Sequence, residues 1–171
     1  NGSIDVSVSV TDGEYTDSDS FILTGNAVND APIADATSSE GNEDLIISIT
    51  LTGSDIDGDQ LTFSLGSGAL NGAVEISGSA ATYTPDQNFN GSDSFTFIIS
   101  DGQLTDEAIV SLIINPVNDT PIADDLTGTT NEDEDVSIVL SGSDVDGDVL
   151  TYLLDQDSAD GFVTIDGTIA T

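Results

Sequence analysis

Gly53-Ser54-Asp55-Ile56-Asp57-Gly58-Asp59 is the stretch that decides how this chain is organised, and it returns as Gly142-Ser143-Asp144-Val145-Asp146-Gly147-Asp148. Each copy places three carboxylates within five residues, separated by one apolar residue and one glycine. Like charges held in one turn repel each other, so a fold keeps such a turn only beside a positive charge. Ca²⁺ takes oxygen ligands of this kind, whereas Mg²⁺ prefers to keep its waters, and the pattern therefore predicts calcium.

The chain supplies no positive charge of its own. Its 171 residues include 33 Asp and Glu but no Lys, Arg or His, which gives a formal net charge of −33. A cation must therefore come from solution. The same composition excludes direct contact with nucleic acid or with an anionic membrane surface, because no side chain can neutralise a phosphate. The longest apolar runs are only a few residues, so membrane insertion is not expected either.

The composition also argues against catalysis. Ser-His-Asp chemistry is impossible without His, and the absence of Cys removes disulfides and thiolates. Paired carboxylates can cleave glycosides, but these carboxylates fall in predicted loops and the chain has no Trp to stack a sugar. The hydrophobic fraction of 37% indicates folded cores rather than a disordered acidic tail. The sequence therefore predicts a folded protein that is not an enzyme.

An internal repeat sets the domain organisation. Val28-Asn29-Asp30-Ala31-Pro32 returns as Val117-Asn118-Asp119-Thr120-Pro121, an offset of 89 residues (117 − 28 = 89) that also links the two acidic stretches. The sequence therefore holds the end of one repeat at 1–28, a complete repeat at 29–117 and the front of a third at 118–171. The unit is close to the roughly 100 residues of an immunoglobulin-like sandwich, so we expect each repeat to have its own core.

Alternating apolar residues predict seven short strands in the complete repeat. A first strand is expected at 33–37, followed by a polar turn at 38–42. The inward positions of the later strands are Leu45, Ile47, Ile49 and Leu51; Leu61, Phe63 and Leu65; Val74 and Ile76; Ala81 and Tyr83; Phe95, Phe97 and Ile99; and Ala108, Val110, Leu112 and Ile114. Turn residues at each junction favour an all-β fold of tandem seven-strand antiparallel sandwiches, Ig-like or cadherin-like, in an extended rod.

Loops alternate between the two ends of such a sandwich, which gathers the acidic residues at the junctions between repeats. The candidate metal ligands at the junction of repeats 1 and 2 are Asn29, Asp30, Asp55, Asp57, Asp59 and Asp101. Those at the junction of repeats 2 and 3 are Glu43, Asp93, Asn118, Asp119, Asp144, Asp146 and Asp148. Each set can offer the six to eight oxygens that Ca²⁺ takes.

Together these motifs resemble the cadherin-like, Ig-like tandem repeats of large secreted bacterial adhesins. The resemblance rests on the Val-Asn-Asp-Ala-Pro linker, Asn-Glu-Asp at 42–44, Ser-Asp-Ile-Asp-Gly-Asp at 54–59, Thr-Tyr-Thr-Pro at 82–85, Phe-Asn-Gly-Ser-Asp-Ser-Phe at 89–95 and Ser-Asp-Gly at 100–102. It implies calcium at the inter-repeat linkers, an extracellular or cell-surface location and many more copies of the repeat. Ile4 stands where the second repeat has Asp93, so the first junction is expected to hold fewer ions or to bind them more weakly.

Each candidate ligand also has a structural alternative. The acidic stretches could be solvated turns, because Asp-Gly is good turn chemistry. Glu43 could cap a turn, and Asp93, in Ser-Asp-Ser, could bond its own backbone. Asp101 could serve only as a hairpin residue.

The function that these observations favour is mechanical. The expected role is a stiff extender in a surface adhesin or fibre, with neighbouring repeats or head-to-tail copies as partners and any surface or cell target at a tip outside this sequence. A self-assembling filament subunit, in which a neighbour donates the strands that the third repeat lacks, is the second hypothesis. A module that binds carbohydrate or protein is the third.

Overall fold

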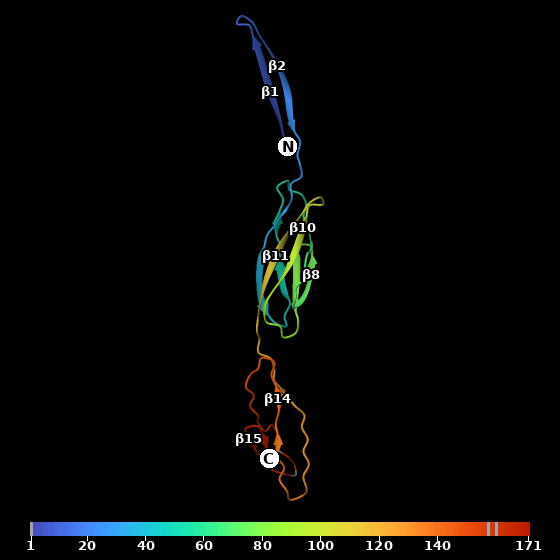
Figure 1. The fold of residues 1–171 in the computed structure, drawn as a ribbon, viewed down its shortest axis with the longest axis vertical. Coiled ribbons are helices and arrows are strands. Elements are labelled where there is room, and N and C mark those ends of the chain that lie inside the picture. The colour runs from blue at the N-terminus through green and yellow to red at the C-terminus, as the bar shows by residue number, and fades with distance from the viewer. Residues whose placement is uncertain (1, 157, 160) are drawn as a thin grey trace.

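The computed structural model describes residues 2–156, 158–159 and 161–171. The predicted first repeat begins at Asn1, which lies outside these ranges, as do Asp157 and Asp160 of the third repeat. A β-hairpin, a β-sandwich and a C-terminal portion follow one another along the long axis (Figure 1). Every regular element in the described residues is a strand, which confirms the all-β prediction. No helix long and apolar enough to cross a bilayer occurs among them.

The N-terminal hairpin consists of β1 (Gly2–Thr11) and β2 (Thr16–Gly25), which pair antiparallel with Gly2 opposite Gly25. Its turn is shaped by Asp12, whose Oδ1 accepts backbone hydrogen bonds from Glu14 and Tyr15 at 2.9 and 2.7 Å. No second sheet covers the hairpin, and all of its strand residues except the half-buried Val6 are exposed.

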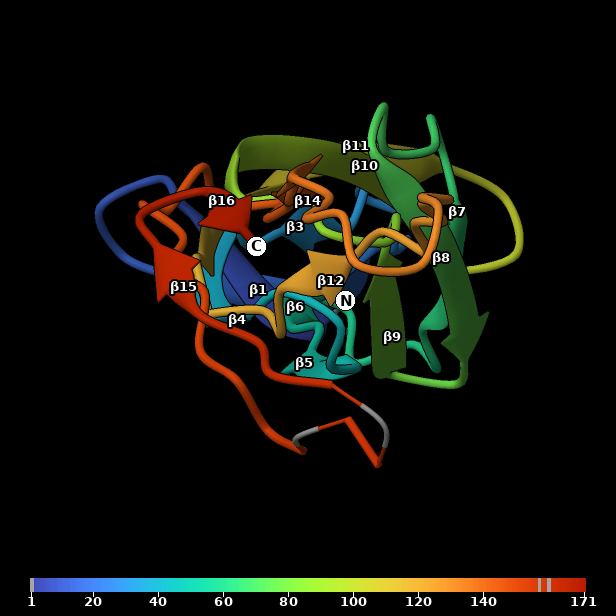
Figure 2. The same ribbon diagram turned by 90° about the horizontal axis from the view of Figure 1, so that it is seen from below.

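The sandwich is built from nine strands between residues 33 and 115, all of which the structure describes. They are β3 (Ile33–Ala34), β4 (Thr37–Asn42), β5 (Ile47–Thr50), β6 (Gly53–Ser54), β7 (Thr62–Leu65), β8 (Gly72–Ser77), β9 (Ala80–Pro85), β10 (Gly91–Ser100) and β11 (Thr105–Asn115). One sheet has the order β4-β11-β10-β7 and the other β5-β9-β8, with a short β3–β6 pair. Seen along the long axis, β10 and β11 lie opposite β5 and β9 (Figure 2). Nine strands stand in place of the predicted seven, because the first predicted strand, 33–37, is divided between β3 and β4, and β6 lies in the acidic stretch, where no strand was expected.

The sequence prediction is wrong in two respects at β4. Residues 38–42, expected as a turn, belong to β4, and β4 pairs with β11 in parallel, so the sandwich is not wholly antiparallel. β3 pairs with β6. The chain then crosses to the sheet that contains β11, where β4 runs parallel to β11. The half-buried positions of β4 are Thr37, Ser39 and Gly41, and residues this small or polar give no hydrophobic alternation to detect.

The core lies between the two sheets and follows the predicted alternation. Its buried apolar residues are Ile47, Ile49, Leu51, Ala81, Tyr83, Phe95, Phe97, Ile99, Val110, Leu112 and Ile114. The rings of Phe63 and Phe97 stack with their centroids 6.3 Å apart. Leu45 and Leu65, predicted to face inward, are exposed, because Leu45 precedes β5 and Leu65 is the last residue of β7.

The C-terminal portion repeats only part of this architecture. It contains β12 (Ile122–Ala123), β13 (Ile138–Val139), β14 (Gly142–Ser143), β15 (Ile165–Asp166) and β16 (Ile169–Ala170), paired as β12-β14 and β13-β16-β15. The positions equivalent to β4 and β7, at 126–131 and 151–154, are not strands. Among the described residues of this portion, no apolar side chain reaches the burial found in the sandwich core.

Candidate functional site

The two acidic stretches adopt the same local structure. Asp55 Oδ1 accepts hydrogen bonds from the backbone N–H groups of Asp57 and Asp59 at 2.9 and 3.2 Å, and Asp144 Oδ1 accepts the equivalent pair at 3.0 and 3.2 Å. The turn needs a left-handed residue, which Gly58 provides with a φ of 80°. The Oδ1 atom of the leading aspartate therefore shapes each loop, and the turn does not use its Oδ2 atom.

The first junction brings the linker, the acidic loop and a hairpin together, as the sequence predicted. The backbone N–H of Asp30 donates to Asp57 Oδ2 at 2.9 Å. Asn29 Nδ2 donates to Asp101 Oδ2 at 2.8 Å. A depression of about 620 Å³ opens beside these contacts, lined by Ala27, Val28, Asn29, Ile56, Asp57, Asp59 and Gln103.

Asp101 shapes its hairpin and also contacts the linker, whereas its role as a metal ligand stays a prediction. Its Oδ1 accepts from the backbone N–H groups of Leu104 and Gln103 at 2.7 and 2.6 Å, which shapes the hairpin, while its Oδ2 faces the linker. The backbone bonds from Leu104 and Gln103, and the bond from Asn29, hold the pKa of Asp101 below its ordinary value.

Glu43 holds the outgoing linker at the second junction. Only 1% of its surface is exposed. Its Oε1 accepts a hydrogen bond from the backbone N–H of Val117 at 2.7 Å, and its Oε2 lies 3.4 Å from Asn90 Nδ2. Its own N–H donates to the carbonyl of Asn115 at 3.0 Å. A buried carboxylate therefore fixes the point at which the linker leaves the sandwich.

Asp119 is the centre of the acidic charge at this junction. Its backbone N–H donates to Asp146 Oδ2 at 2.7 Å. Burial raises the pKa of its carboxyl group, and the negative charges of Asp146, Asp44, Glu43 and Asp144 raise the pKa further. Carboxylates from the sandwich, the linker and the C-terminal portion therefore act on one another here, as the sequence predicted.

Two carboxylate oxygens are buried without a hydrogen-bond partner among the described residues: Asp55 Oδ2 at the first junction and Asp119 Oδ2 at the second. Leaving such an atom unsatisfied costs free energy. The charged groups that act on Asp119 are all carboxylates, and carboxylate oxygens suit a hard cation such as Ca²⁺. No group of three or more acidic side chains in the described part of the chain is already gathered to hold a metal ion. The carboxylate ligands are thus of the kind that calcium takes, but in the described residues they do not already surround a metal position.

Asp44 is a candidate that sequence reasoning missed. It has a left-handed backbone with a φ of 59°, and its Oδ1 accepts from the backbone N–H of Asn88 at 3.0 Å. Its charge also acts on Asp119. The signal was present, because the whole triplet Asn42-Glu43-Asp44 recurs at 131–133, where Asp133 has a φ of 65°.

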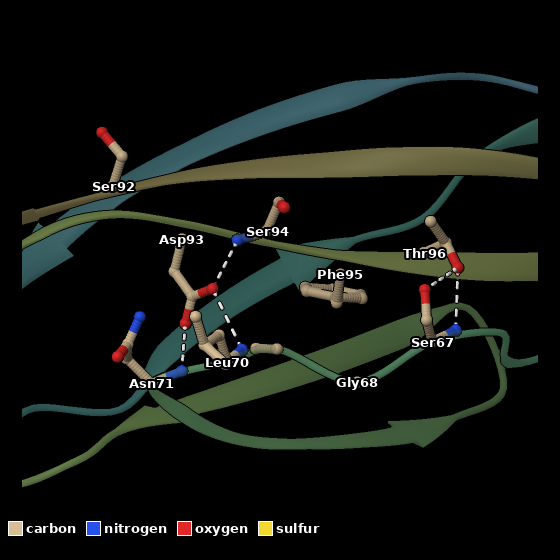
Figure 3. Close-up of a pocket in the computed structure, with 10 residues that line it drawn as sticks. Ser67, Gly68, Leu70, Asn71, Ser92, Asp93, Ser94, Phe95 and Thr96 are labelled. Carbon is tan, nitrogen blue, oxygen red and sulfur yellow. Dashed lines mark hydrogen bonds between the residues drawn. The ribbon is translucent and has the colours of Figure 1, made fainter.

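Asp93 is engaged within the sandwich. Its Oδ1 accepts from the backbone N–H groups of Ser94 and Leu70 at 2.8 and 3.1 Å, and its Oδ2 from that of Asn71 at 2.8 Å (Figure 3). Oδ2 also accepts from the Tyr83 hydroxyl at 2.9 Å. Burial pushes the pKa of Asp93 up, but the hydrogen bonds outweigh it and hold the pKa below its ordinary value. Its role as a metal ligand stays a prediction, and its oxygens already have four donors.

A comparison with protein families gives a match for the sandwich. The family model of the bacterial Ig domain matches residues 29–113, which are the first linker and nearly all of the sandwich. The chain contains a module that is similar to the bacterial Ig domain. Families of this kind are generally non-enzymatic. A search of curated proteins finds no match.

Several solved structures match part of this chain. Human protocadherin-24 EC1-2 is 23% identical, with 68% of this chain and 62% of that chain covered and a TM-score of 0.49. An endo-fucoidan hydrolase from glycoside hydrolase family 107 is 22% identical, with 68% and 19% covered and a TM-score of 0.45. The titin domains Z1Z2 in complex with telethonin are 12% identical, with 84% and 81% covered and a TM-score of 0.38. The chain thus spans only 19% of the hydrolase.

Proposed function

We propose that this chain is a calcium-stabilised structural region of a secreted or cell-surface adhesin or extracellular fibre, and that it acts as a stiff extender. The observation that carries the proposal is the buried, partnerless Oδ2 of Asp119, surrounded by acidic groups in a chain without a cationic side chain. Bound Ca²⁺ would supply the positive charge that the junction lacks. Bacterial Ig domains are typically extracellular or surface-exposed, which agrees with this role.

The side chains that would hold the ion come from both sides of the linker at the second junction. There they are Glu43, Asp44, Asn118, Asp119, Asp144, Asp146 and Asp148. At the first junction they are Asn29, Asp30, Asp55, Asp57, Asp59 and Asp101, which all belong to the repeat at 29–117. Because the second set combines residues of two repeats, an ion shared among them would tie these repeats together.

The linker contacts explain why neutralising the charge would stiffen the molecule. Pro32 is fully buried, and hydrogen bonds from Asp30 and Asp119 join each linker to the acidic loop that follows it. Without a cation, the carboxylates repel one another and oppose these contacts. Extracellular modules bind Ca²⁺ with dissociation constants of roughly 10⁻⁴–10⁻³ M, so millimolar calcium outside a cell would hold the junctions rigid.

Small-angle scattering with calcium and with a chelator tests this proposal. We expect the maximum dimension to be longer and better defined in calcium. Asp144→Asn combined with Asp146→Asn should abolish most of the difference. The matched control is Asp135→Asn with Asp155→Asn, which removes two exposed charges from the same portion and should leave the difference intact. A wild-type scattering profile that is indifferent to calcium would contradict the proposal.

A further inference from the structure

Strand β8 is an edge of the sheet β5-β9-β8. It lies along one flank of the sandwich in both views of the molecule (Figure 1 and Figure 2). Its inward residues Val74 and Ile76 pack against the core. Its outward residues Ala73, Glu75 and Ser77 are exposed. The edge strand of the other sheet, β7, contacts β8, so both sheets end on this flank.

The backbone of β8 carries hydrogen-bonding groups that face away from its sheet. The N–H of Asp86 donates to the carbonyl of Asn71 at 2.9 Å, and bonded pairs alternate along an antiparallel ladder. The N–H and C=O groups of Ala73 and Glu75 therefore face β9. Those of Val74 face outward, where the sheet has no further strand within the described residues. An edge of this kind is a template for another strand.

The segment that contains this edge is almost without charge. Residues 60–85, which span β7, β8 and β9, include one acidic residue, Glu75, whereas the whole chain has 33 in 171. Natural edge strands are commonly protected by charges, Pro or a bulge. The other six-residue edge strand, β4, contains Glu40 and leads directly into Glu43 and Asp44. Two copies of charge −33 therefore repel each other less at β8 than at the acidic ends of the sandwich.

The sequence of β8 fits an antiparallel partner of the same sequence. With Val74 of one copy opposite Val74 of the other, the two strands exchange their outward N–H···O bonds. In that register Glu75 of each copy lies opposite Ala73 of the other. A register with Glu75 opposite Glu75 also satisfies the bonding pattern, but it places two like charges together. Charge therefore selects the first register.

We propose that β8 pairs antiparallel with β8 of a second copy, so that two molecules associate side by side. The contact uses the same surface on both copies and joins two three-stranded sheets into one. Because the strands run along the long axis, the two molecules point in opposite directions (Figure 1). Extenders that project from two facing surfaces meet in this orientation. That use rests on the proposed function, whereas the pairing itself does not require calcium.

Single-cysteine cross-linking tests the register, because the natural chain has no Cys. Ala73→Cys and Glu75→Cys each place one thiol on the outward face of β8. Opposite residues that exchange no backbone bonds have Cα atoms about 4.5 Å apart, which a disulfide can span. We expect an equimolar mixture of the two variants, oxidised with diamide in chelator, to form mixed disulfides well above the share that random pairing gives. Intact mass spectrometry separates the mixed dimer from the two homodimers.

The matched control for cross-linking lies at the opposite edge of the same sheet. Ser48→Cys and Thr50→Cys place thiols at two exposed positions of β5 with the same spacing. This pair should cross-link slowly and without preference for the mixed dimer.

Sedimentation equilibrium of the wild-type chain up to about 1 mM, in chelator and about 0.15 M salt, measures the association. We expect a monomer of 17.5 kDa in equilibrium with a dimer. Ala73→Asp places a charge opposite Glu75 at two symmetry-related positions and should weaken dimerisation about fivefold or more, whereas Ala73→Lys should strengthen it. Thr50→Asp adds the same charge on β5 and should leave dimerisation nearly unchanged. All of these positions are exposed, so the variants should fold.

Three results would overturn the proposal. The first is a wild-type chain that stays monomeric, with the β8 thiols cross-linking no faster than the β5 thiols. The second is equal weakening by Ala73→Asp and Thr50→Asp, because the contact would then not use β8. The third is a predominance of Glu75→Cys homodimers, which contradicts the register. Calcium is absent throughout, so failure here leaves the proposed function standing, and a scattering profile indifferent to calcium leaves the pairing standing.

Discussion

The linkers at 28–32 and 117–121 have nearly the same sequence but different surroundings. At the first, Asn29 is half-buried against Asp101 and Asp30 is exposed. At the second, Asp119 is half-buried among acidic groups and Asn118 is exposed. The first linker is contacted by the hairpin of the repeat that follows it. The second linker is contacted by the Glu43 turn of the repeat that precedes it.

The two junctions share the linker and the acidic loop but differ in the segment that contacts the linker from the other side. The Asn-Asp pair of the linker and the acidic loop are present in both, with the same bond from the linker N–H to the loop at 2.9 and 2.7 Å. What buries each linker residue is supplied by a neighbouring repeat. The degree of burial of each linker residue is therefore a property of the junction and not of the linker sequence.

The largest effect is expected from copying Ile4 of the first repeat onto the second. Asp93→Ile removes the acceptor for Leu70 N–H, Asn71 N–H and the Tyr83 hydroxyl, so we expect a loss of about 3 kcal/mol or more in the free energy of unfolding. Urea denaturation of the sandwich measures it. Asp35→Ile, at an exposed position, should change stability by less than about 0.5 kcal/mol. A small loss at Asp93 would show that its hydrogen bonds do not matter to the fold.

A smaller effect is expected at Glu43, which anchors the second linker. Glu43→Ala leaves the N–H of Val117 without its acceptor and should cost about 1–3 kcal/mol, even in chelator. The same substitution at the exposed Glu40 should be nearly neutral. If the whole loss at Glu43 required calcium, the residue would be only a ligand and not an anchor of the linker.

The effect of Asp119→Asn on the melting temperature should change sign when calcium is added. Because the folded-state pKa of Asp119 is raised, its charge lowers stability above that pKa, and this penalty disappears as the pH falls below the ordinary value near 3.9. In chelator at pH 7, the substitution should therefore raise the melting temperature. In calcium it should lower it, because a ligand is lost. Asp30→Asn, at the exposed equivalent, should show a weaker reversal. The same sign in both conditions would argue against calcium at Asp119.

The smallest effect is expected at Asn29. Asn29→Ala removes one bond to Asp101, so the pKa of Asp101 should move up toward its ordinary value and stability should fall by under about 1 kcal/mol. A lowered pKa stabilises the fold above the ordinary value, and this contribution is lost as the pH falls through the folded-state pKa. NMR titration measures the shift. Asn118→Ala is the matched control, because its amide contacts only the carbonyl of Asp119, and a shift of Asp101 there would refute the assignment.

Much of the fold and of the candidate site could be predicted from the sequence because both depend on repetition. The period of two placed all eleven buried apolar residues. Ten of them belong to β5, β9, β10 and β11, and the eleventh, Leu51, directly follows β5. The offset of 89 residues placed the linker, the acidic loop and the Asp101 hairpin together. The parallel strand β4 could not be predicted, because its inward residues are small or polar. Asp44 was missed because it looks like an ordinary turn residue.

The sequence by itself predicted the β-sandwich and showed the 89-residue recurrence and the lack of Lys, Arg and His, because alternation, recurrence and composition are readable without coordinates. Only the tertiary structure decided which carboxylate oxygens are buried without a partner and which, as in Asp93, already have donors. The physical reason is that the pKa and hydrogen bonding of a carboxylate depend on groups far away in the chain. Glu43 and Val117, which are 74 residues apart, meet only once the sheets have packed.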